Sequence, residues 1–182
     1  KHFVDTFRST YRGWFEYILR VTQQVYDQGW VRQPVTGRMR RSPSTLQSWG
    51  LKERPQSLGH LRELCRGNYP LQEIVRSIAN SLDQGFASGD LTKLVCTVID
   101  RKFRRMEFRS QLCNTIHDEI LIDVHPEEEK EVIQIAYKMA THPPLVAAFG
   151  SDFDIPIGVE LGIGENWSES KRKENRVDCS RT

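Results

Sequence analysis

The sequence predicts an α+β fold in which helices pack against a small antiparallel sheet, and three observations support this class. Apolar residues recur at helical spacing over residues 2–28 and 68–84. Two β-branched, apolar segments at 112–116 and 120–124 flank a polar pair, which is typical of a tight hairpin. With 182 residues, 38% of them hydrophobic and 27% charged, the chain is long enough for one domain with a sizeable core.

The N-terminal segment predicts two helices separated by a break at Gly13, and Gly29 is a suitable C-terminal cap for the second. Residues 30–33 and the basic residues 38–41 are expected to pair as strands across a Pro- and Gly-containing turn. The Ser-, Pro- and Gln-rich residues 42–58 predict an irregular connection.

The longest predicted helix covers residues 68–84, where the apolar side chains form one buried stripe: Leu71, Ile74, Val75, Ile78, Ala79 and Leu82. Gly85 to Asp90 is expected to end this helix. A further helix is predicted at 91–103, and it leads into a basic cluster best interpreted as a solvated face: Arg101, Lys102, Arg104 and Arg105.

The hairpin is expected at 111–124, with His117, Asp118 and Glu119 at its turn. A turn would present the two carboxylates at a surface or cleft, because burying them without a partner would be very costly. Adjacent carboxylates of this kind suggest a cation, although an ordinary polar turn explains the same residues.

A helix is predicted from Pro126, with acids at its positive end, as far as His142. Residues 155–161 alternate as a last strand, and the polar residues from Ser168 predict a frayed tail. Trp14 and Trp167 are expected to be core anchors.

Charge is distributed unevenly along the chain. Residues 1–112 hold 19 Lys and Arg against 10 Asp and Glu, whereas residues 113–170 hold 2 against 12. A basic part of this kind suits a polyanion, and an acidic part suits a metal or solvent. The sequence has no run of eighteen apolar residues and no signal-peptide pattern, so no membrane partner is expected. The four widely spaced cysteines favour a reduced, intracellular compartment, the cytoplasm or nucleoid, with an organelle left open.

Four segments in fixed order resemble the C-terminal palm region of family A DNA polymerases, the DNA polymerase I-like enzymes. They are Gly29 to Arg41, Asn68-Tyr69-Pro70-Leu71-Gln72, Ile116-His117-Asp118-Glu119-Ile120 (motif C), and Gly162-Ile163-Gly164-Glu165-Asn166-Trp167. Each is weak alone, but their order and spacing cover nearly the whole chain. The resemblance implies helices following the fingers at 1–28, a palm at 29–167 with a DNA-binding helix at 68–84, and a flexible tail at 168–182.

The implied activity is template-directed transfer of dNMP from a dNTP to a primer 3′-hydroxyl, assisted by two magnesium ions. By resemblance Asp118 is the Mg²⁺ ligand of motif C, Glu119 a supporting carboxylate, and His117 a contact to the primer end. Carboxylate oxygen is the ligand that Mg²⁺ prefers.

Primer-template DNA is the implied partner. Asn68 and Gln72 match the amides that probe the minor groove, where every base pair offers acceptors. The basic residues Arg38, Arg40 and Arg41 suit phosphate contacts, which position DNA without reading its sequence.

The chain also departs from the family pattern. Leu64 stands where many members have a basic residue, and the stretches 86–108 and 141–154 are longer than in compact members. Motif A and the fingers are expected on a second polypeptide, without which the chain has one of two metal-binding aspartates. The alternatives are a non-catalytic DNA-binding module derived from a palm, or an unrelated metal-dependent hydrolase.

Overall fold

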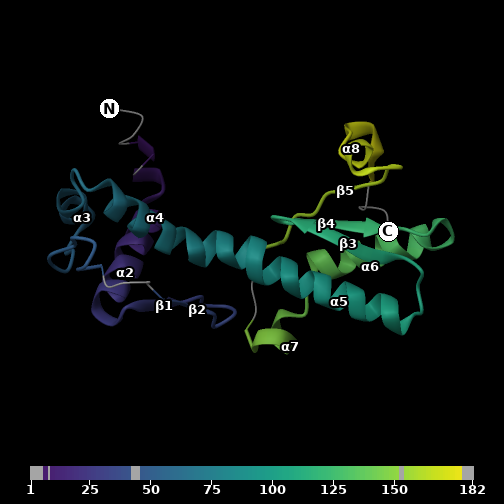
Figure 1. Ribbon diagram of the computed structural model, residues 1–182, viewed down its shortest axis with the longest axis horizontal. Coiled ribbons are helices and arrows are strands. Elements are labelled where there is room, and N and C mark those ends of the chain that lie inside the picture. The colour runs from purple at the N-terminus through teal and green to yellow at the C-terminus, as the bar shows by residue number, and fades with distance from the viewer. Residues whose placement is uncertain (1–5, 8, 42–45, 152–153, 178–182) are drawn as a thin grey trace. The chain divides into compact units, whose positions relative to one another are not determined.

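The computed structural model describes residues 6–7, 9–41, 46–151 and 154–177, and the chain divides into two compact units, residues 1–86 and 87–182. Across the described residues, helices alternate with two-stranded antiparallel sheets (Figure 1), which confirms the predicted α+β class. No helix within these ranges is both long and apolar enough to cross a membrane.

The first unit begins with a long helix, α2 (Arg12–Gln28). Gly29 ends it with a φ of 78° and donates its N–H to the carbonyl of Val25 at 2.8 Å, as predicted. The predicted break at Gly13 is wrong, because Gly13 lies inside α2 and the turn falls at Tyr11. A single glycine costs a helix only about 1 kcal/mol relative to alanine, which is too little to end it.

A short hairpin follows, in which β1 (Trp30–Arg32) pairs with β2 (Met39–Arg41) as predicted. The side-chain oxygen of Gln33 accepts the N–H groups of Val35 and Thr36 at 2.6 and 2.7 Å and so closes the loop. In the connection to α3 (Leu58–Leu64), residues 46–50 form turns, and residues 42–45 lie outside the described part.

The predicted long helix is α4 (Tyr69–Gln84). The face of α4 that packs into the core is the predicted apolar stripe, and Leu71, Val75, Ile78 and Leu82 on it are buried. These side chains belong to one cluster with residues of α2 and β1, including Val21, Val25 and Val31.

The α-helix ends at Gln84 with Gly85 as its C-cap, as predicted, but the residues that follow are not an open turn. A π-helical turn, η1 (Gly85–Leu91), follows α4 directly, and α5 (Thr92–Arg105) follows η1 directly. Phe86 is buried within η1, so an apolar contact accompanies the two glycines that suggested a break.

The second unit packs α5 and α6 (Glu129–Thr141) against a hairpin of β3 (Gln111–Ile116) and β4 (Glu119–Asp123). Its core cluster contains Val95, Ile99, Phe103, Val132 and Ala136. The short 3-10 turn η2 (Pro126–Glu128) precedes α6, and α7 (Leu145–Phe149) follows it. The predicted hairpin and the predicted helix ending at His142 are both confirmed.

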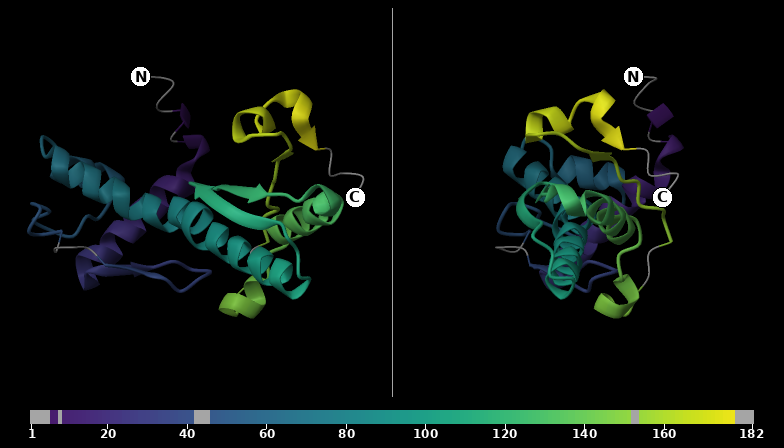
Figure 2. Two further views of the ribbon diagram at one scale, coloured as in Figure 1. Left: turned by 45° about the vertical axis from the view of Figure 1, so that its right-hand side comes forward. Right: turned by 90° about the vertical axis from the view of Figure 1, so that its right-hand side faces the viewer.

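The C-terminal part corrects two predictions. Residues 155–160 form no strand, and β5 (Leu161–Gly162) pairs instead with β6 (Arg176–Val177). Between them lie α8 (Trp167–Ser170) and the 3-10 turn η3 (Lys173–Asn175), where composition suggested a frayed tail. Figure 2 shows this segment turning back on itself on the side of the hairpin away from α5.

Candidate functional site

The candidate site is built around the two-residue turn of the β3–β4 hairpin. Ile116 pairs with Glu119, which leaves His117 and Asp118 as the loop. His117 has a φ of 57°, in the left-handed region that two-residue hairpin turns require and that glycine or asparagine usually occupies. A histidine in that conformation carries backbone strain, and such strain collects at functional positions.

A bulge and strand alternation decide which side chains of the hairpin meet the core. The register shifts between Leu112 and Asn114, so Cys113 is the extra residue. Ile120 and Ile122 pack on the cluster formed with α5 and α6. Because successive residues of a strand point to opposite faces, Glu119 lies on the face away from that cluster.

Glu119 is held by the C-terminal segment. Its Oε1 accepts the indole N–H of Trp167 at 2.8 Å, and its Oε2 lies 3.0 Å from Nζ of Lys171. The hydrogen bonds from Trp167 and then Lys171 stabilise the ionised carboxylate and lower the pKa of Glu119.

Asp118 is exposed, and no described residue hydrogen-bonds to its carboxylate or pairs with it. The described residues also contain no group of three or more His, Cys, Asp and Glu side chains that could hold a metal ion. The donor chemistry of Asp118 suits Mg²⁺, but a magnesium site needs further oxygen ligands. The turn therefore offers a single carboxylate to a cation.

The two amides predicted to meet DNA lie at the start of α4, in the other unit. Asn68 is the N-cap: its Oδ1 accepts the N–H of Leu71 at 3.1 Å, and its Nδ2 donates to the carbonyl of Trp49 at 2.8 Å. Gln72 donates its Nε2 to the carbonyl of Cys65 at 2.8 Å. Each amide nitrogen carries two hydrogens, so one donor of each remains after these contacts.

The three arginines of β2 and its turn lie in the same unit. Arg38 donates to the carbonyl of Ser81 at 3.1 Å, near the C-terminal end of α4. Ser81 is thirteen residues beyond Asn68, which is roughly 20 Å along a helix. The Nε of Arg40 is shielded from solvent and has no acceptor among the described residues, and Nε of Arg41 contacts the sulfur of Met39 at 3.5 Å.

Trp167 and Lys171 are the contacts of the candidate site that sequence reasoning missed. Trp167 and Trp14 were expected in the core, but their exposed fractions are 44% and 39%. The missed signal was local: Trp167 and Lys171 are four residues apart, which brings side chains together on a helical turn. Lys171 Nζ lies 4.3 Å from the centroid of the Trp167 ring.

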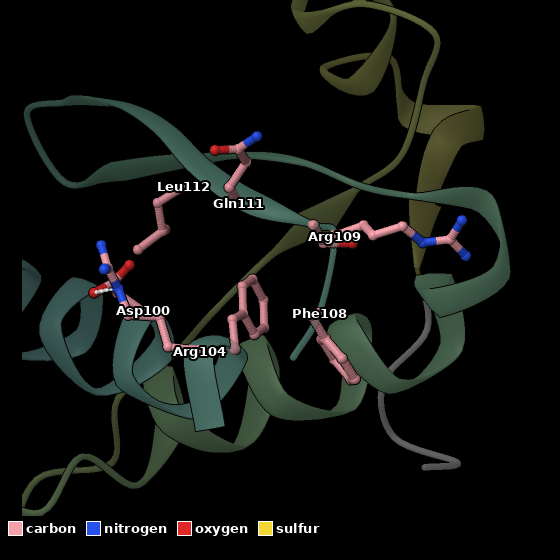
Figure 3. A pocket seen from close by; sticks show the side chains of 8 residues that line it. Asp100, Arg104, Phe108, Arg109, Gln111 and Leu112 are labelled. Carbon is pink, nitrogen blue, oxygen red and sulfur yellow. Dashed lines mark hydrogen bonds and ion pairs between the residues drawn. The ribbon is translucent and has the colours of Figure 1, made fainter. Parts of the chain in front are cut away.

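A pocket of about 400 Å³ opens at the other end of the hairpin, between the end of α5 and the start of β3 (Figure 3). Asp100 and Arg104 are paired at 2.9 Å on its wall, and Arg109 points away from it towards Glu127. The pocket is lined by Gln111 and Leu112 of β3, whereas the carboxylates lie at the turn, so it holds none of the predicted site residues.

Comparisons with known proteins place the chain in a family of polymerases. The profile of DNA polymerase family A matches residues 1–169. DNA polymerase I of Lactococcus lactis subsp. lactis is 25% identical over 172 residues, and that of Synechocystis sp. is 24% identical over 173 residues. Each alignment covers 94% of this chain but only 16% of the relative, so the chain spans a small part of their length.

Among solved structures, the POL domain of Pol1 from M. smegmatis, in complex with DNA primer-template and dNTP, has the same fold. The TM-score is 0.61 at 23% identity, over 86% of this chain and 23% of that one.

Proposed function

The chain belongs to DNA polymerase family A, and on that premise we propose that it is the C-terminal palm part of a template-directed DNA polymerase. It would supply the motif C aspartate for transfer of dNMP from a dNTP to a primer 3′-hydroxyl. The observation that carries this proposal is the exposed carboxylate of Asp118, presented by a strained two-residue turn in a chain that matches the family almost throughout.

Asp118 would be the Mg²⁺ ligand of this chain. When bound, magnesium would stabilise the negative charge on the attacking 3′-oxygen and on the leaving pyrophosphate. The exposed, unpaired carboxylate fits this use, while Glu119 supports the turn beside it. The remaining ligands and the nucleotide clamp would come from the part of the polymerase that carries motif A and the fingers, on this or a second polypeptide.

The DNA contacts would lie along α4 and the β1–β2 hairpin. The amides of Asn68 and Gln72 are held in place by their own contacts to the backbone, so their remaining donors need no further ordering to meet minor-groove acceptors. Arg38 marks the other end of α4. A separation of roughly 20 Å corresponds to about six steps of duplex, at 3.4 Å each.

The phosphate role falls mainly to Arg40 and Arg41, since Arg38 is anchored to Ser81. Their guanidinium groups would donate charge-assisted hydrogen bonds to phosphate oxygens of the duplex. His117, with its exposed side chain at the turn, would contact the primer end.

The proposal is tested by combining the chain with the motif A and fingers part from the same source, primer-template, dNTPs and Mg²⁺. Primer extension is expected, and Asp118→Ala should abolish it. Asp123→Ala is the matched control, because Asp123 is also exposed on the same hairpin but lies at its open end, opposite Gln111. An inert mixture, or equal loss in both variants, contradicts the catalytic proposal.

The same samples separate the catalytic proposal from a non-catalytic DNA-binding module. A module of that kind binds duplex with a steep salt dependence and no need for Mg²⁺, and Asp118→Ala leaves its only activity intact.

A further inference from the structure

Three side chains from distant parts of the second unit meet at the hairpin turn, and we call them the Glu119 clamp: Glu119, Trp167 and Lys171. Both carboxylate oxygens of Glu119 are occupied, one by the indole N–H at 2.8 Å and the other by the lysine ammonium at 3.0 Å. The ammonium also lies 4.3 Å from the centroid of the indole ring, within the range of a cation–π contact.

The segment that carries Trp167 and Lys171 is itself tightly built. A Cβ at Gly162 would lie 1.9 Å from the carbonyl oxygen of Ser170, and one at Gly164 would lie 2.6 Å from the nitrogen of Ser170. Asn166 caps α8 by accepting the N–H of Glu169 at 3.1 Å. The glycines therefore let α8 pack directly on the strand that leads into it, which fixes the position of Trp167.

Three joined contacts distinguish the clamp from an ordinary surface ion pair. Lys171 and Glu119 retain 53% and 34% of their side-chain exposure, and an isolated pair of this kind contributes little. Here the ion pair is joined by a directed N–H bond and a ring contact, from a segment whose backbone is held by close packing. Contacts joined in a network of this kind contribute more together than the sum of the single contacts.

The clamp acts at the residue that closes the turn. Glu119 forms the last pair of the β3–β4 ladder with Ile116 and directly follows Asp118. Fixing Glu119 restrains the turn on one side, and with Glu119 held by Trp167 and Lys171, Asp118 is the carboxylate of the turn that has no partner among the described residues.

We propose that Trp167 and Lys171 are positioning residues that hold Glu119 and thereby fix the turn carrying Asp118. This inference rests on the proposed polymerase function for its catalytic consequence. Its structural half does not, because the clamp lies entirely within the chain.

The structural half is tested by ¹H–¹⁵N NMR of the 182-residue chain. The chain has four tryptophans, and the indole resonance that disappears in Trp167→Phe identifies Trp167. Glu119→Ala should shift this indole resonance, and Lys171→Met should shift the backbone amide resonances of His117 and Asp118. Lys173→Met is the matched control, because Lys173 is exposed in the same segment. An indole resonance that does not respond to Glu119→Ala, or turn amides that do not respond to Lys171→Met, overturns the proposal.

The catalytic half is tested by steady-state extension with the complementing polymerase part. Substituting a residue that hydrogen-bonds to a group at a metal site typically lowers activity by roughly 10- to 100-fold. Lys171→Met and Trp167→Phe should therefore lower kcat by that factor with the KM for dNTP unchanged. Lys171→Arg should restore most of the rate, and Lys173→Met and Trp14→Phe should match the wild type.

The two possible failures are distinguishable. If Asp118→Ala abolishes extension while Lys171→Met and Trp167→Phe leave kcat unchanged, the positioning role is refuted and the polymerase function stands. If Asp118→Ala has no effect, the polymerase function fails, and the NMR response of the turn amides alone decides whether the clamp fixes the turn.

Discussion

Replacing Gly162 with alanine tests whether the C-terminal segment is built as described. The added Cβ would lie 1.9 Å from the carbonyl oxygen of Ser170 and 3.0 Å from its carbonyl carbon, whereas ordinary contacts begin near 3.4 Å. Both atoms belong to backbone, so no side-chain rotation relieves the clash. The backbone of β5 must therefore move away from α8.

Inserting a methyl group into a packed site typically costs about 1–3 kcal/mol. The cost should appear locally, because β5 and β6 form only a two-residue ladder and can separate without unfolding α5 or α6. The amide of Ile163 donates to the carbonyl of Asn175 at 3.0 Å and reports on this separation. Its hydrogen-exchange protection should fall by about 5- to 150-fold, which is the factor equivalent to that cost.

Gly158→Ala is the matched control. A Cβ at Gly158 would have no atom within 4 Å, and Gly158 lies in the same C-terminal stretch. Its effect should stay within about 0.5 kcal/mol, as for other surface substitutions. If the hydrogen-exchange protection of the Ile163 amide is as high in Gly162→Ala as in Gly158→Ala, the close packing of β5 and α8 is refuted.

The remaining predictions concern stability. Ile99→Ala, at a position with 1% exposure, should lower the free energy of unfolding by about 2–5 kcal/mol, seen as a lower urea midpoint with an unchanged m-value. Asn68→Ala removes the N-cap of α4 and should cost about 0.5–2 kcal/mol in the same assay; an unchanged midpoint would contradict the cap. Burial opposes ionisation of Glu128, but hydrogen bonds from Ser110 and from the backbone of Arg109 and Ser110, with the charge of Arg109, lower its pKa to about 2. The folded pKa lies below the ordinary 4.5, so this contribution is complete above pH 4.5 and is lost as the pH falls towards 2, and Glu128→Gln should remove that dependence of the urea midpoint on pH.

The elements that could be predicted from the sequence are those whose signal is local and periodic. The stripe of α4 repeats over three turns, so burial on one face follows directly from the spacing of Leu71, Val75, Ile78 and Leu82. The hairpin was also predictable, because two apolar segments flank a two-residue polar step. Gly13 misled the interpretation, since a glycine lowers helix stability without specifying where a helix ends.

The C-terminal segment could not be predicted, because its stability depends on contacts between residues that its polar composition does not reveal. Gly162 and Gly164 are needed for close approach to Ser170, and that approach is visible only once α8 is in place. The same holds for the Glu119 clamp, since Trp167 is 48 residues from Glu119. The carboxylates themselves were recognised from the motif, whereas the side chains that hold one of them were not.

Asp118 is proposed to supply a metal-binding carboxylate for nucleotidyl transfer, and the sharpest test is single-turnover primer extension with the Asp118→Asn chain and the complementing polymerase part. The side chain is exposed and has no partner among the described residues, so the substitution should leave the urea midpoint unchanged. Losing several kcal/mol of metal-assisted stabilisation should lower the extension rate by about 10³-fold or more. Asp123→Asn should extend at the wild-type rate. If Asp118→Asn extends the primer as fast as Asp123→Asn does, Asp118 is not a catalytic metal ligand.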